Sequence, residues 1–287
     1  MNLESTSVCQ LPPYPGSDDK GPVVLQYLED QDNLVACGSV YEEAGKACHS
    51  MPSSVSSQSP SWSAMPSLLG SHCYYPASTR SHYLSSLGWF VFGQQSCFQG
   101  FASELFTEDQ EWIETPTSSP YTTKATSDFP WDTCSVALNN THIMVTGGFN
   151  GTAALNAAWI LDLTDYTRIL AAPMPLARYD HGCTTKADGG MLIAGGFDGD
   201  TSLEFVQSYD PATDTWSLED LLPNAMDHFY PVLFHWNKTS ILLEWGSDKV
   251  WMRTSDGWEA MEATIGSRFY GSVDTAVLVP ASFSDCP

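Results

Sequence analysis

Gly147-Gly148-Phe149-Asn150-Gly151 returns 48 positions later as Gly195-Gly196-Phe197-Asp198-Gly199. The same offset carries Leu161-Asp162 onto Tyr209-Asp210. An offset that stays unbroken over this span is an internal repeat. A repeat near this length restricts the fold to a few architectures, in which each copy is one supersecondary unit.

Apolar stretches that run into glycine mark further copies of the unit. They lie at 34–38, 89–93, 143–148, 191–196 and 242–246. The last glycines of successive stretches are 55, 55, 48 and 50 residues apart, so the repeat covers nearly the whole chain. A single double glycine is an ordinary turn, but five copies in register predict one closed repeat domain.

Aromatic residues repeat along with the glycines. Tyr209 and Trp216 stand seven residues apart across a turn rich in Pro, Asp and Thr, and Trp251 and Trp258 have the same spacing. A tryptophan recurs at this outer position in four copies, as Trp62, Trp112, Trp216 and Trp258. Arg168 replaces it in the third copy, where we expect the outer strand to pack differently.

A strand ending at a double glycine, a strand ending in Tyr-Asp and a strand led by Trp together resemble the kelch motif. The resemblance implies an all-β fold, a kelch-type β-propeller of four-stranded antiparallel blades. Blades stacked around an axis bury both faces and leave no long free edge. We expect the double glycine where the strand nearest the axis lacks room for a side chain and the backbone needs a positive φ.

The repeat divides one propeller domain, 1–287, into recognisable units. The blades are expected at 21–66, 79–118, 131–173, 178–223 and 228–265, with 1–20 near the ring closure and 266–287 as closing strand and tail. The segment 268–280 has the pattern of a first strand with nothing after it. It either completes the N-terminal blade, giving five blades, or begins a sixth, and we favour six.

The charge balance excludes some partners. The chain has 11 Lys and Arg against 34 Asp and Glu, a net charge of -23. Nucleic-acid binding needs a basic surface to displace counterions, so we expect no nucleic-acid partner. No stretch reaches the roughly 18 apolar residues of a membrane helix, so we expect no membrane span.

An even number of cysteines favours disulfides, whereas reduced, buried cysteines are the alternative for an intracellular chain. The eight are Cys9, Cys37, Cys48, Cys73, Cys97, Cys134, Cys183 and Cys286. Cys134 and Cys183 each open the first strand of neighbouring blades, and Cys37 and Cys48 flank one turn. The expected pairs are Cys37 with Cys48, Cys134 with Cys183, Cys9 with Cys286 across the ring closure, and Cys73 with Cys97.

Three N-glycosylation sequons begin at Asn139, Asn150 and Asn237, each in or beside an expected turn. With the cysteines they favour an extracellular, secreted glycoprotein. The opening residues 1–7 lack the basic and apolar regions of a signal peptide. Either the chain begins at a mature or truncated end, or the protein is cytoplasmic.

Three histidines follow the starts of blades, and repeated positions of a propeller lie at similar heights near the axis. They are His82, His181 and His228. Three facing imidazoles would hold a metal, but hydrogen bonding between blades explains the same positions. We favour the second explanation and predict no metal, cofactor or catalytic residue, because no nucleophile elbow or phosphate loop is present.

These patterns predict a non-catalytic extracellular scaffold that binds a protein or glycan through its loops. The chain resembles secreted single-domain kelch proteins of invertebrates, with Cys37-Gly38 in the first blade and Cys286 after Val279-Pro280. Two other functions stay open. One is an enzyme using His181, His228, Asp180 and Asp227 at the channel mouth, and the other is an intracellular substrate adaptor whose partner domain lies on another chain.

Overall fold

The computed structural model describes the part of the chain that holds five blades. The described residues are 14–15, 24–28, 31–38, 46–52, 61–70, 79–94, 101–116, 130–223, 231–236, 239–244 and 249–264. They form five four-stranded sheets in which every strand pair is antiparallel. The predicted all-β propeller of four-stranded blades is confirmed.

The strands follow one another around the ring, four to a blade. Blade one has β1 (Val24–Leu28), β2 (Asn33–Cys37), β3 (Cys48–Pro52) and β4 (Ser63–Met65). Blade two has β5 (Thr79–Leu84), β6 (Gly88–Gln94), β7 (Phe101–Phe106) and β8 (Trp112–Glu114). Blade three has β9 (Cys134–Ala137), β10 (His142–Thr146), β11 (Ala158–Asp162) and β12 (Thr167–Leu170). Blade four has β13 (Gly182–Thr185), β14 (Met191–Ala194), β15 (Phe205–Asp210) and β16 (Thr215–Leu221). Blade five has β17 (Val232–Trp236), β18 (Thr239–Leu243), β19 (Lys249–Thr254) and β20 (Gly257–Thr264).

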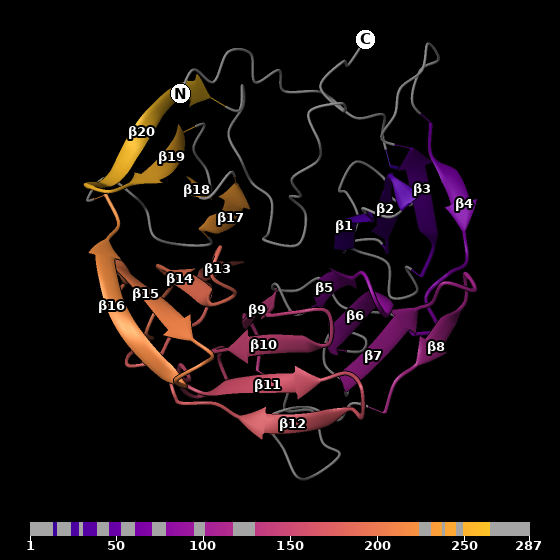
Figure 1. Ribbon diagram of the computed structural model, residues 1–287, viewed down its shortest axis with the longest axis horizontal. Helices are drawn as coiled ribbons and strands as arrows, with labels where there is room; N and C mark the ends of the chain where they lie inside the picture. Colours follow the sequence, from indigo (N-terminus) through magenta and orange to yellow (C-terminus); the bar gives the residue numbers. More distant parts are fainter. Residues whose placement is uncertain are drawn as a thin grey trace.

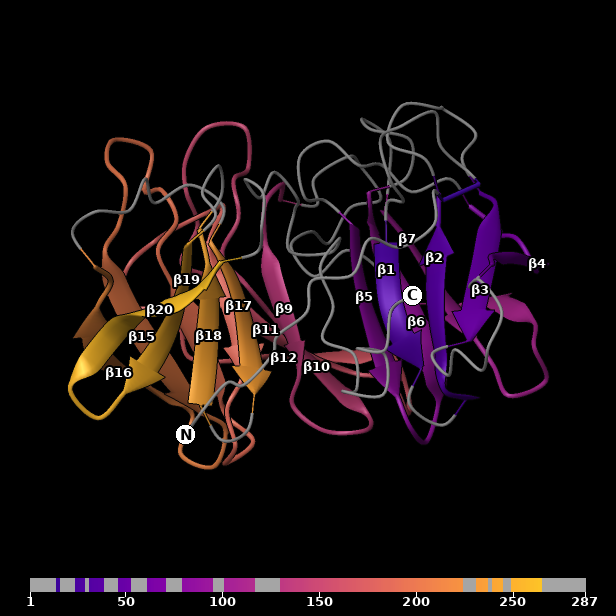
Figure 2. The ribbon, with the colours of Figure 1, turned by 90° about the horizontal axis from the view of Figure 1, so that it is seen from above.

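The first strand of each blade lies nearest the axis and the fourth lies at the rim (Figure 1). The inner strands β1, β5, β9, β13 and β17 contact one another in that order. The loops that follow β10 and β14 project from the same side of the ring (Figure 2). The preference for six blades concerns 1–23 and 265–287, which lie outside or almost wholly outside the described residues, so it stays a prediction.

Continuous apolar runs in the second strands build the core. All four residues of β14 are buried, as are the last four of β10. A strand between two blades faces apolar neighbours on both sides, so its sequence loses the alternation of a half-exposed strand. The cluster around Met144 and Ile193 spans blades three and four and includes Cys134 and Cys183.

The double glycines end the second strands, β10 and β14, rather than the strand nearest the axis as expected. Gly147 and Gly148 have φ values of 63° and 103°. A Cβ on Gly147 would lie 2.4 Å from the Arg178 carbonyl oxygen, so a side chain there would collide with the next blade. The predicted need for positive φ and close approach is therefore confirmed, and the backbone of the neighbouring blade causes it.

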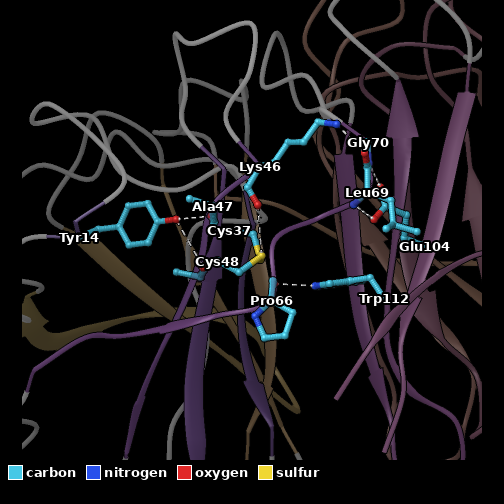
Figure 3. The surroundings of a disulfide bond; sticks show 11 residues. Tyr14, Cys37, Lys46, Ala47, Cys48, Pro66, Leu69, Gly70, Glu104 and Trp112 are labelled. Carbon is cyan, nitrogen blue, oxygen red and sulfur yellow. Dashed lines mark hydrogen bonds between the residues drawn. A yellow bond between two sulfur atoms is a disulfide. The ribbon is translucent and has the colours of Figure 1, made fainter. Parts of the chain in front are cut away.

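In blades two and four the outer tryptophan forms a hydrogen bond with the chain that leaves the preceding blade. The Trp112 indole donates a 2.9 Å hydrogen bond to the Pro66 carbonyl oxygen (Figure 3), and Trp216 donates one of 2.8 Å to Ala172. In blade three the Arg168 guanidinium instead lies over the Trp159 ring, 5.9 Å from its centroid. The expected difference in that blade is thus a cation–π contact.

Within the described residues there are two disulfides, and both are among the four expected pairs. Cys37–Cys48 joins β2 to β3 within blade one (Figure 3), whereas Cys134–Cys183 joins β9 to β13 across two blades. No described cysteine is free. The expected pairs Cys9–Cys286 and Cys73–Cys97 lie outside the described residues.

Candidate binding face on blades three and four

Four aromatic rings form a row across the face where β9 and β13 begin. Their centroids are separated by 6.1 Å from Trp131 to Phe149, 5.1 Å from Phe149 to Tyr179 and 5.6 Å from Tyr179 to Phe197. All four side chains are half-buried. We call Trp131, Phe149, Tyr179 and Phe197 the aromatic row.

Backbone pairing holds the row in place. Trp131 and Phe149 exchange hydrogen bonds of 2.9 and 2.8 Å, and Tyr179 and Phe197 exchange bonds of 3.0 and 2.9 Å. Each pair therefore ties the loop before a first strand to the loop after a second strand. The Gly148 amide also donates to the Arg178 carbonyl oxygen at 2.9 Å, which joins the two blades.

The loops beside the row have the same turn built on two different side chains. Asn150 Oδ1 accepts hydrogen bonds from the Thr152 and Ala153 amides at 3.0 and 2.9 Å. At the equivalent place Asp198 Oδ1 accepts from the amides of residues 200 and 201 at 2.8 and 2.7 Å. These amide donors lower the pKa of Asp198, so its exposed carboxyl is ionised at neutral pH.

Two carboxyl groups lie beneath the row at equivalent positions of the repeat. Asp132 and Asp180 are 5% and 8% exposed, and both have left-handed backbones with φ of 57° and 54°. The Asp180 amide donates to the Asp132 carbonyl oxygen at 3.1 Å. Burial and the neighbouring Asp180 carboxyl raise the pKa of Asp132, although the Arg80 guanidinium opposes the shift. The pair therefore shares a proton at neutral pH.

His82 and His181 form hydrogen bonds between blades rather than with one another. His82 Nε2 lies 2.7 Å from Ser135 Oγ, and His181 Nε2 lies 3.0 Å from Thr146 Oγ1. His82 lies within β5, whereas His181 directly precedes β13. His228 lies outside the described residues. The described residues contain no group of three potential metal ligands.

Both histidines are neutral. Desolvation, helped by Arg80, lowers the pKa of His82 to about 3. Desolvation also lowers the pKa of His181, with smaller contributions from Arg178 and Arg80. Neutral imidazoles in these hydrogen bonds connect neighbouring blades.

A buried arginine completes the attachment of blade four. Arg178 is fully buried, and its Nη1 donates to the carbonyl oxygens of Gly195 and Phe205 at 2.8 and 3.1 Å. Its Nη2 donates to Gln207 Oε1 at 2.9 Å. Burial lowers the pKa of Arg178 to about 10, which leaves it charged at neutral pH. These bonds fix the start of the loop that carries Tyr179.

Two of the three sequons are described and exposed. The Asn139 and Asn150 side chains make their backbone hydrogen bonds through Oδ1. Those bonds leave out Nδ2, the atom to which an N-linked sugar is attached. Asn237 lies outside the described residues.

Sequence reasoning did not single out the aromatic row. Phe149 and Phe197 stand in the repeated stretch itself, directly after the double glycines. Their recurrence in the repeat could have marked these two phenylalanines as equivalent positions on neighbouring blades. Trp131 and Tyr179 were not recognisable as partners, because the bridges that bring them there join separate loops.

Comparison with known proteins agrees with this architecture. The model of the kelch motif matches residues 130–175 and 177–219. Kelch-like protein 35 of Homo sapiens is 30% identical over 126 residues, or 44% of this chain, and that of Mus musculus is 32% identical over the same length. The chain spans about a fifth of the length of these relatives, because the match covers 20% of each.

A solved structure of YjhT superposes with a TM-score of 0.63 at 12% identity, covering 88% of both chains, which shows the fold alone. The matched motifs in blades three and four, together with the five four-stranded blades, support a kelch-repeat β-propeller. Kelch repeats imply a protein-binding scaffold. Within the described ranges no helix has the length and hydrophobicity needed to span a bilayer.

Proposed function

We propose that the chain is a non-catalytic, extracellular scaffold that binds a partner protein through the loops of blades three and four. The observation that carries this function is the aromatic row. Rigid, half-buried rings supply a large contact area at little entropic cost, and aromatic residues are enriched at protein interfaces. Backbone bridges hold the rings before any partner binds, which lowers the cost of association.

The chemistry beneath the row favours binding over catalysis. His82 and His181 are neutral and engaged between blades. The enzyme alternative would need His181 and Asp180 to reach a substrate, yet both are less than a tenth exposed. A fold of this kind does not itself define an activity, so the face and not the fold supports the proposal.

Site-specific photocrosslinking tests the binding face. A photoreactive phenylalanine derivative at position Thr152, beside the row, is expected to capture a protein from conditioned medium or cell surfaces. The same derivative at Leu170, which is 66% exposed on β12, serves as the control. Crosslinks to one partner from both positions, or from Leu170 alone, would count against this face.

Two observations support the extracellular setting. Four described cysteines are paired, and disulfides persist in oxidising compartments. Asn139 and Asn150 are exposed sequons. Expression with a secretion signal in animal cells, followed by peptide mapping, is expected to show glycans at both sites and no free thiol. Material purified without reductant from the cytosol with all thiols free and full stability would favour the intracellular adaptor.

A further inference from the structure

We propose that the aromatic row binds the Lys or Arg side chains of a basic segment in the partner protein. This inference rests on the proposed function and specifies the chemistry of the partner. Two features of the face carry it: the arrangement of the rings, and the carboxyl groups that surround Tyr179.

The rings are tilted against one another rather than coplanar. The interplanar angles are 40° between Trp131 and Phe149, 48° between Phe149 and Tyr179, and 84° between Tyr179 and Phe197. A row tilted in this way offers separate ring faces to separate cations, whereas a sugar chain stacks best on rings in one plane. Ammonium and guanidinium groups are attracted to such ring faces within about 6 Å of the centroid.

Three carboxyl groups act on the middle of the row. Asp132, Asp180 and Asp198 each directly follow a residue of the row in sequence. All three raise the pKa of the Tyr179 hydroxyl, after the larger effect of desolvation. Asp132 is 5% exposed, so a bound side chain does not contact it directly, and the exposed carboxyl of Asp198 is the group that a cation can reach.

The buried charges near the row offset one another: Arg80 faces Asp132, which shares a proton with Asp180, and Arg178 remains charged. The ionised Asp198 is exposed on the rim of the row. The whole chain has a net charge of -23, which attracts basic partners over a distance. The local and overall charges therefore select the same class of ligand.

The repeat supplies a conservative variant for the test. Asp198→Asn removes one charge beside Tyr179, and blade three already uses Asn150 for the same turn with the same two hydrogen bonds. The variant should therefore keep the stability of the wild type. Phe197→Ser removes the last ring. The controls are Glu108→Gln, an exposed acid in blade two, and Leu170→Ser on the rim of blade three.

The probe is a fluorescein-labelled peptide of alternating Arg and Gly, compared with its Lys and Gln counterparts, in anisotropy titrations of the full chain. We expect Asp198→Asn to weaken binding of the Arg peptide about threefold. We expect Phe197→Ser to weaken it about fivefold. The two controls should bind like the wild type, the Gln peptide should not bind, and added salt should weaken binding.

Equal weakening by Glu108→Gln and Asp198→Asn would overturn the inference, because attraction to overall charge explains that result. Unchanged binding by both face variants would overturn it as well. A glycan array signal that Phe197→Ser abolishes, without peptide binding, would assign the row to sugars instead. A partner that crosslinks from Thr152 but binds equally well to Asp198→Asn would refute the basic segment and leave the proposed function standing.

Discussion

Gly147→Ala tests whether the double glycine is required by its neighbour or only by its backbone conformation. Its Cβ would lie 2.4 Å from the Arg178 carbonyl oxygen and 2.7 Å from His181 Cε1. Gly151, four positions on in the same loop, also has a positive φ, of 88°, but its Cβ would meet nothing within 4 Å. Gly151→Ala is therefore a matched control that measures the cost of the left-handed backbone conformation alone.

The left-handed conformation costs a residue with a Cβ about 1 kcal/mol, and that cost applies to both variants. The overlap with blade four adds about 2 kcal/mol to Gly147→Ala alone. We therefore expect the free energy of unfolding to fall by about 3 kcal/mol for Gly147→Ala and about 1 kcal/mol for Gly151→Ala.

Urea unfolding followed by tryptophan fluorescence measures the difference. With a slope of about 2 kcal/mol per M, the midpoint of Gly147→Ala should lie about 1 M below that of Gly151→Ala. The same contrast should recur between Gly196→Ala and Gly199→Ala, because a Cβ on Gly196 would lie 2.6 Å from the Tyr179 carbonyl oxygen and Gly199 has open space. Equal costs within either pair would refute the argument from close approach.

Three further outcomes are expected. Cys134→Ser should destabilise the oxidised protein by about 4 kcal/mol and Cys37→Ser by about 3 kcal/mol, since the first disulfide closes the longer loop; chemical unfolding without reductant compares them. Burial and the neighbouring Arg80 lower the folded-state pKa of His82 to about 3. The unfolded state therefore binds a proton that the folded state does not, and the free energy of unfolding should decrease as pH falls from about 6.5 towards 3. His82→Gln should flatten that part of the plot of stability against pH. The contribution of Asp132 to stability should change with pH in the opposite direction. Its raised pKa makes the folded state bind a proton that the unfolded state releases, so Asp132→Asn should stabilise the protein at pH 7 relative to pH 4 in parallel thermal melts; an equal effect at both pH values would argue against a shared proton.

The periodic part of the fold was predictable from sequence because each copy of the repeat carries the same pattern of apolar, glycine and aromatic residues. The glycine spacing indicated five repeated units, and the aromatic spacing indicated their outer strands. Arg168 broke the pattern visibly, but its stacking on Trp159 needed the register that pairs β11 with β12. Disulfide pairing was accessible where a repeat places two cysteines at the starts of adjacent inner strands, as for Cys134 and Cys183.

The candidate site was less predictable, because loop-to-loop bridges bring its members together. The repeat pattern placed His82 and His181 shortly after the starts of their blades, and the structure places the first within β5 and the second directly before β13. Counting residues from the start of a blade leaves an uncertainty of a few residues in where a side chain lies along its strand. Whether that side chain can form a given hydrogen bond depends on this position. The proton shared by Asp132 and Asp180 likewise depends on burial, which the sequence alone does not report.

At the rim of the ring, the hydrogen bonds of Trp112 and Trp216 join a side-chain donor to a main-chain acceptor. Every residue type carries a carbonyl oxygen, so the preceding blade contributes to this joint whatever its sequence is. Only the later blade must keep a particular residue. A propeller joined in this way can gain, lose or exchange a unit by duplication without both sides of the new junction having to change together.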